Sequence, residues 1–286
     1  MNESVDEFIT DIIEREERNR QVLSILLERQ RERDGHLLAL HSRMGQISAY
    51  VTTVDLAWAA QRIRFVADLP LFQDQADGAP VNSNRGATGD AHRRCLDWRR
   101  QLPMTLYLAT KKHHKFAPLL VVGYQKWIQD ENAEQWGADD RAMRSSLTIT
   151  PLEPKGRYCD LDTTGTSYYV VDGQHRLMAI HGLHDLLTKG QLHAMDADGN
   201  PRQNQRITRD EIVRCIQDDC GDKESNANVR LEVLMSERIG IEIIPAVAVG
   251  ESYEDALIRL RRTFAEVGTN GGTAVARTTR SEAGSL

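Results

Sequence analysis

The sequence predicts an α/β or α+β protein in which a small mixed sheet of about four strands is flanked by helices. From residue 117 onward, short apolar segments alternate with segments whose apolar residues recur at helical spacing. No internal repeat interrupts this order. The 286 residues, 40% of them hydrophobic, suffice for one large domain or two small ones with a sizeable core.

Residues 1–44 are expected to form an N-terminal helical arm, either as two helices or as one long helix. Its apolar residues recur at helical spacing: Val5, Phe8, Ile9, Ile12, Ile13, Val22, Ile25 and Leu26. Such an arm serves packing or self-association, so a homo-oligomer formed through it is an expected assembly. The segment 45–70 begins with a short extended stretch, and Asp55 then caps a helix that ends before Pro70.

The middle of the chain begins with a predicted loop at 72–92, which is rich in Gly, Asn, Asp, Ser and Pro. A helix is expected around 91–110, and residues 125–144 are irregular or helical. We interpret KGRYCDLDTTGTS (155–167) as a turn region between strands. The strands predicted here are 117–124, 146–152 and 168–171.

The helix that follows the 168–171 strand has a clear apolar stripe and ends at Gly190. A further helix is predicted near 208–218, where Thr208 and Glu211 form a capping box. The next predicted element along the chain is a strand at 239–250, in which Pro245 indicates either an edge strand of the sheet or a β-bulge.

The last predicted helix covers 252–268 and begins with the pair Ser252 and Asp255. The remaining residues, 269–286, show no periodicity and are expected to be a disordered tail. The domain organisation predicted is therefore an arm (1–44), one main domain (45–268) and this tail.

Composition excludes several classes of protein. No run reaches the ~18 apolar residues of a membrane span, and the polar N-terminus is not a secretory signal, so a cytoplasmic protein without membrane contact is expected. The four cysteines form no C-x-x-C pair and are interpreted as idle thiols. The net charge of −6 predicts no bulk attraction to DNA, although residues 91–115 hold seven lysines and arginines against Asp97 alone.

The strongest functional signal is the corner between the 168–171 strand and its helix, which reads Asp172, Gly173, Gln174, His175, Arg176. Glycine lets the chain turn sharply or approach a ligand closely. The first-turn amides of the helix point outward at its positive end, which favours an anion. An imidazole and a guanidinium add donors at the same place. The pattern predicts a phosphate-binding corner.

Other roles for these side chains remain open. Asp172 is either a helix cap or a catalytic or metal-binding acid, and Gly173 or His175 has a purely structural alternative. Arg176 either grips a phosphate or forms a salt bridge to Asp172 or another acid.

The segment VVDGQHRLMAI resembles the signature of the DGQHR-domain family, which includes DndB-type proteins associated with DNA phosphorothioation. A fainter likeness runs from roughly 45 to 270. The family is itself similar to the ParB/sulfiredoxin fold, in which the equivalent corner binds a nucleotide triphosphate. The resemblance therefore implies a ParB/sulfiredoxin-like core, with Gly173, Gln174, His175 and Arg176 holding phosphates. Where the family often has an asparagine and further helices, this chain has Gly268 and soon ends.

The function implied is a regulatory one in a DNA-modification or defence locus, with DNA and nucleotide as partners. If hydrolysis occurs, Asp172, His175 and Arg176 are the catalytic candidates, and ATP or another nucleotide triphosphate with Mg²⁺ is the cofactor. One alternative is a nucleotide triphosphatase or DNA-nicking enzyme that uses the same corner. Another is a catalytically inactive interaction protein.

Three further groups of residues carry possible chemistry. A nucleic-acid contact is predicted for Lys111, Lys112, His113, His114 and Lys115, with a solvated charge cluster as the alternative. Asp160 and Asp162 are candidates to hold Mg²⁺ beside a nucleotide, or they are solvated turn residues. The His181 and His184 pair has the spacing of one helix face, but no further ligand is evident, so no metal site is predicted.

Overall fold

The computed structural model describes residues 10, 12–18, 20–21, 35–73, 96–220 and 224–278. The strands are β1 (His36–Met44), β2 (Ile47–Asp55), β3 (Ile63–Phe65), β4 (Leu119–Tyr124), β5 (Thr148–Pro151), β6 (Tyr158–Asp162), β7 (Ser167–Asp172), β8 (Gln191–Met195), β9 (Pro201–Thr208) and β10 (Arg238–Pro245). Eight of them form one sheet in the order β3-β7-β4-β10-β2-β1-β6-β5, and β8 and β9 form a separate ribbon. Parallel pairs (β3–β7 and β4–β10) occur beside antiparallel ones, so the sheet is mixed, as predicted.

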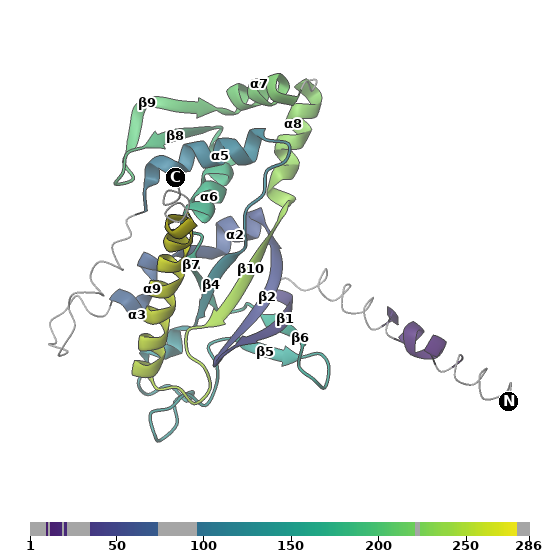
Figure 1. The fold of residues 1–286 in the computed structure, drawn as a ribbon, viewed down its shortest axis with the longest axis vertical. Helices are drawn as coiled ribbons and strands as arrows, with labels where there is room; N and C mark the ends of the chain where they lie inside the picture. The colour runs from purple at the N-terminus through teal and green to yellow at the C-terminus, as the bar shows by residue number, and fades with distance from the viewer. Residues whose placement is uncertain are drawn as a thin grey trace, which may run out of the picture.

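Helices cover both faces of this sheet (Figure 1). The helices are α2 (Leu56–Arg62), α3 (Pro70–Gln73), α5 (Gln101–Thr110), α6 (Gln174–Lys189), α7 (Arg209–Cys220), α8 (Glu224–Val233) and α9 (Tyr253–Thr278), with short 3-10 turns η1 (Val66–Asp68), η2 (Trp98–Arg100), η3 (Lys126–Gln129) and η4 (Leu234–Ser236). One buried apolar cluster joins α2, α5, α6, α7 and α8 to the sheet. A second cluster joins α3 and the first part of α9 to it. The described part of the chain is thus a layered α+β fold with the sheet between two helical layers.

Four predicted helix ends are confirmed. Each is determined by a capping residue within one turn of the helix end. Asp55 accepts a hydrogen bond from the Trp58 amide at 2.6 Å at the start of α2. Thr208 and Glu211 exchange hydrogen bonds before α7, and the Ser252 hydroxyl accepts from the Asp255 amide at 3.1 Å. Gly190 ends α6 in the left-handed conformation.

The predicted N-terminal helical arm is wrong for residues 36–44, which form β1. This strand buries the alternating residues Leu37 and Ala39 and pairs with β2 and β6. Its run of Leu and Ala favours a helix locally, but pairing to two neighbouring strands overrides that preference. Of residues 1–34, the described positions are helical, and the remainder of the arm lies outside the described residues.

The strand count was also too low. The predicted turn region 155–167 contains β6, whose short alternation buries Cys159 and Leu161. β10 lies between β4 and β2, so the edge or bulge inferred from Pro245 is wrong: this proline is the last residue of the strand.

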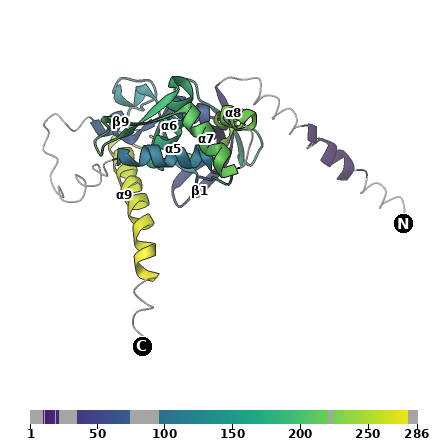
Figure 2. The same cartoon turned by 90° about the horizontal axis from the view of Figure 1, so that it is seen from above.

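The C-terminal region differs from prediction as well. α9 runs on to Thr278, so a disordered tail is wrong for residues 269–278, where no proline interrupts the helix. This helix extends beyond the sheet (Figure 2). Residues 74–92 of the predicted loop and 279–286 of the predicted tail lie outside the described residues. No helix among the described residues has the length and apolar character needed to span a membrane.

Candidate functional site

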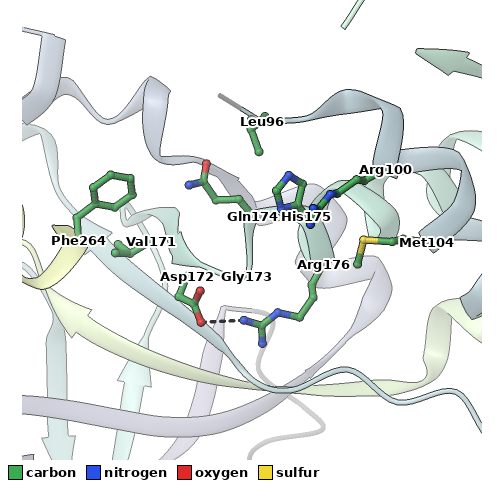
Figure 3. A pocket seen from close by; sticks show the side chains of 10 residues that line it. All are labelled: Leu96, Arg100, Met104, Val171, Asp172, Gly173, Gln174, His175, Arg176 and Phe264. Carbon is green, nitrogen blue, oxygen red and sulfur yellow. Dashed lines mark hydrogen bonds and ion pairs between the residues drawn. The ribbon is translucent and has the colours of Figure 1, made fainter. Parts of the chain in front are cut away.

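The end of β7 and the start of α6 border a cavity of about 380 Å³ (Figure 3). β7 lies in the sheet between β3 and β4, and its last residue, Asp172, pairs with Leu120 of β4. All five residues of the predicted corner line the cavity. The lining residues are Leu96, Arg100, Met104, Val171, Asp172, Gly173, Gln174, His175, Arg176 and Phe264.

Gly173 makes the sharp turn that the sequence predicted. It has φ 91° and ψ 21°, in the left-handed region, and is the N-cap of α6. A Cβ added here would lie 2.5 Å from Cδ2 of Leu119 and 2.9 Å from Nε of Arg176. Both the backbone conformation and the close approach of these two side chains therefore require glycine.

Arg176 folds back over this glycine and fastens the corner. Its Nη2 donates to Asp172 Oδ2 at 2.8 Å, and its Nη1 donates to the carbonyls of Ala117, at 2.8 Å, and Pro118. The guanidinium thus ties the end of β7 to the chain entering β4. Of the alternatives open at the sequence level, the salt bridge to Asp172 is confirmed.

The interpretation of Asp172 as the helix cap is wrong. Gly173 is the N-cap and no side chain caps α6, because the carboxylate turns to Arg176 instead. The acid still organises the turn, but it does so through the ion pair. α6 consequently begins with no acid in its first turn, and the amides of residues 174–176 have no acceptor among the described residues.

His175 is held by the segment before α5. Its Nε2 accepts a hydrogen bond from the Asp97 amide at 3.2 Å, which leaves Nδ1–H as the donor in the neutral ring. Burial lowers the pKa of His175, the charge of Arg100 lowers it further, and Asp97 opposes both effects. We therefore assign His175 as neutral at pH 7.

Arg100 is a cavity residue that the site prediction missed. It belongs to η2, its side chain is exposed, and its guanidinium lies 4.0 Å from the Asp97 carboxylate. Figure 3 shows it next to the His175 ring, with Gln174 on the other side of that ring. The only signal in the sequence was the basic composition of residues 91–115, which does not single out one arginine.

The cavity is therefore rich in hydrogen-bond donors. Free helix amides, the Gln174 amide, the His175 ring and Arg100 surround it, while Phe264 and Val171 close one end (Figure 3). Among the described lining residues Asp172 is the one carboxylate, and Arg176 already neutralises it. Such an arrangement favours an anion with several oxygen atoms.

The predicted basic contact segment does not line this cavity. His114 is held inside the fold, with Nδ1 2.8 Å from the Lys111 carbonyl and Nε2 2.6 Å from Glu237 Oε2. It is therefore a poor candidate for contacting a phosphate. Lys111, Lys112, His113 and Lys115 are exposed, at the end of α5 opposite Arg100.

Asp160 and Asp162 also lie away from the corner. They are on β6, which is joined to the start of β7 by the turn at 163–166. The cavity is at the other end of β7, roughly 17 Å further along that strand. Asp160 contacts the His36 ring at 3.1 Å, and Asp162 accepts from the Thr164 amide at 2.8 Å. The proposed Mg²⁺ role beside the corner is therefore wrong for both.

The described residues add no metal ligand to the His181 and His184 pair. His181 packs edge-on against Phe65, and burial lowers its pKa. Within the described ranges, no three His, Cys, Asp or Glu side chains lie together as a potential metal site.

The fold and this site together define a mixed α+β protein with a donor-rich cavity at a strand-to-helix corner. Searches against protein-family models, curated proteins and solved structures found no match to this chain.

Proposed function

We propose that this protein binds the phosphate group of a nucleotide or of DNA in the cavity at the start of α6. The observation that carries the proposal is the convergence of free first-turn amides, His175 and Arg100 on one cavity. We further propose that the chain is a DGQHR-domain protein of the DndB type with a ParB/sulfiredoxin-like core, acting as a regulator in DNA modification. The DGQHR signature supports this part of the proposal.

The geometry favours binding over hydrolysis. Phosphoryl transfer needs a group that orients or activates the nucleophile, in addition to donors that stabilise charge. Asp172 is the natural candidate among the lining residues, but its carboxylate is bound to Arg176. Arg176 in turn spends three hydrogen bonds on Asp172 and two carbonyls, so its main role is to shape the corner.

The test compares two neighbouring arginines with nearly equal exposure, 62% for Arg100 and 61% for Arg99. Arg100 lines the cavity, whereas Arg99 forms two hydrogen bonds to Asp97 and does not line it. We expect Arg100→Gln to weaken binding of ATP or a short DNA duplex by about tenfold, the value of one charge-assisted contact. Arg99→Gln should change it by less than about twofold.

Isothermal titration calorimetry on the full chain at fixed salt measures both variants. Equal losses in the two variants would show a non-specific charge effect and contradict the cavity as the binding site. Nucleotide turnover followed in the same samples distinguishes a regulator from an enzyme: turnover that disappears in Arg100→Gln would favour the hydrolase instead.

A further inference from the structure

A second cavity, of about 600 Å³, lies between η3, the loop that follows it and the first residue of α9. None of its described lining residues also lines the first cavity, at the start of α6. They are Ile128, Gln129, Glu131, Trp136, Asp140 and Tyr253. Aromatic rings and carboxylates thus meet in one hollow, and nothing in the proposed function uses it.

The aromatic wall is held in place by its neighbours. The rings of Trp136 and Trp127 pack edge to face with centroids 5.2 Å apart, and Trp127 Nε1 donates to Gln125 Oε1 at 2.9 Å. A β-bridge from Trp136 to Ala142 fixes the backbone behind the indole. A fixed indole face carries negative charge density and is the best aromatic partner for a cation.

The segment that surrounds this wall is strongly acidic. Residues 129–140 (QDENAEQWGADD) contain five acids and no lysine or arginine. Asp130 and Asp139 accept hydrogen bonds from backbone amides of their own turns. Glu131 and Asp140 are exposed, line the cavity and form no ion pair with any described residue.

Arg141, which follows Asp140 in the chain, is held within the fold. Arg141 donates to the Gly250 carbonyl at 2.7 Å and lies 3.9 Å from the Asp255 carboxylate. The start of α9 is capped by Ser252, and its first turn contains Glu254 and Asp255, which offset the positive helix end. The described lining of the cavity thus contains two carboxylates and no basic side chain, which favours a cation over phosphate, although the charge of Arg261 acts on Tyr253.

We propose that this second cavity binds an organic ammonium group, with its methyl or methylene groups against Trp136 and Tyr253 and its charge beside Glu131 and Asp140. A hard metal ion is a poor fit, because Ca²⁺ and Mg²⁺ require about six or more oxygen ligands and an aromatic wall supplies none. The same ammonium chemistry occurs on small amines and on lysine side chains, so the site accepts either source. This cavity shares no described lining residue with the one proposed to bind phosphate.

The test uses choline and its uncharged isostere, 3,3-dimethylbutan-1-ol, titrated into the full-length protein and followed by nuclear magnetic resonance. Because the two molecules share their shape, the cavity should bind choline at least about tenfold more tightly if cation–π attraction and the acids operate. A trimethyllysine peptide and spermidine, titrated in parallel, distinguish a protein partner from a small amine.

Three substitutions assign the binding to this cavity. Trp136→Ala should weaken choline binding about tenfold. Glu131→Gln and Asp140→Asn should each weaken it about threefold, and asparagine keeps the left-handed backbone of Asp140, whose φ is 57°. Glu134→Gln is the matched control, because Glu134 is an exposed acid of the same segment that does not line the cavity.

Because Glu131 and Asp140 are exposed, their variants keep the test valid even if Trp136→Ala fails to fold. Equal binding of choline and its isostere, no binding of any ammonium probe, or equal losses in Glu131→Gln and Glu134→Gln would overturn the proposal. Failure here would leave the phosphate site untouched, since Arg100 and His175 lie in the other cavity.

Discussion

The two cavities both lie at the beginning of a helix that packs on the sheet, yet their chemistry is opposite. α6 begins at Gly173 with no side-chain cap and no acid in its first turn. α9 begins at Tyr253, directly after Ser252, whose hydroxyl accepts a hydrogen bond from the Asp255 amide, and its first turn contains two acids. The amino-terminal end of α6 is thus open to an anion, whereas the same end of α9 is closed to one. The N-cap and the first-turn residues decide which.

The two sites also lie at opposite ends of one pair of strands. β4 and β7 are antiparallel neighbours, the first cavity follows the end of β7, and the second follows the end of β4 through η3. Ligands at opposite ends of one strand pair do not share lining residues. Each cavity can therefore be altered without changing the other, which makes the comparison experimentally separable.

The largest expected effect comes from giving the open helix start a side chain. Gly173→Ala forces an alanine to adopt positive φ and brings its Cβ to 2.5 Å from Leu119 Cδ2. We expect a loss of about 3 kcal/mol in the free energy of unfolding, from backbone strain and overpacking together. Urea denaturation followed by circular dichroism measures it.

Gly165→Ala separates the two causes. Gly165 also has positive φ, 71°, but an added Cβ would meet nothing within 4 Å. It should cost only about 1 kcal/mol, the backbone part alone. Equal losses at the two glycines would mean that Arg176 and Leu119 do not restrict the corner.

The next largest effect is expected at Arg176, if its main role is to hold the corner together rather than to bind a ligand. Arg176→Gln removes a charge-assisted bond to Asp172 and bonds to two carbonyls, for an expected loss of about 2 kcal/mol. A double-mutant cycle with Asp172→Asn should give a coupling energy of about 1 kcal/mol or more.

The pair Asp185 and Lys189 provides the matched control for this cycle. It has the same four-residue spacing and lies wholly on α6, the helix of Arg176, with N and O 3.0 Å apart, but its lysine is largely exposed. Its coupling should be about 0.5 kcal/mol or less. A coupling as small between Asp172 and Arg176 would return Arg176 to the group of ligand-binding candidates.

Local chemistry explains which parts of this fold the sequence predicts well. Asp55, the Thr208 and Glu211 pair, and Ser252 each act within one helical turn, so their roles are visible in a few letters. The turn at Gly173 belongs to the same group. By contrast, β1 has residues that favour a helix and becomes a strand only because β2 and β6 lie beside it.

The candidate site shows the same limit. Asp172 and Arg176 are only four positions apart, so the sequence offered their salt bridge as one alternative to phosphate binding by Arg176. Which alternative holds depends on the carbonyls of Ala117 and Pro118, which also accept hydrogen bonds from Arg176. Those carbonyls reach the corner through sheet formation. Arg100 likewise reaches the cavity because η2 precedes α5, which packs against α6. Neither contact has a periodic signal in the sequence.

The smallest expected effect is a pH dependence carried by His175. Burial and Arg100 lower the pKa of His175 below its ordinary 6.5, so the unfolded chain binds this proton more readily than the folded one. The stability contributed by the neutral ring is fully present above pH 6.5 and is lost as the pH falls from there through the lower pKa of the folded state. Protonation also removes the acceptor for the Asp97 amide.

His175→Gln should therefore flatten the fall in unfolding free energy between pH 7.5 and about pH 5.5, measured by urea denaturation at each pH. An anion in the cavity should act in the opposite direction, because it favours the imidazolium and raises the pKa. Sulfate, whose charge is constant over this range, should then bind more tightly as the pH falls, with proton uptake that His175→Gln abolishes. A sulfate affinity that is independent of pH in both proteins would place the anion away from His175 and remove one side of the comparison between the two helix starts.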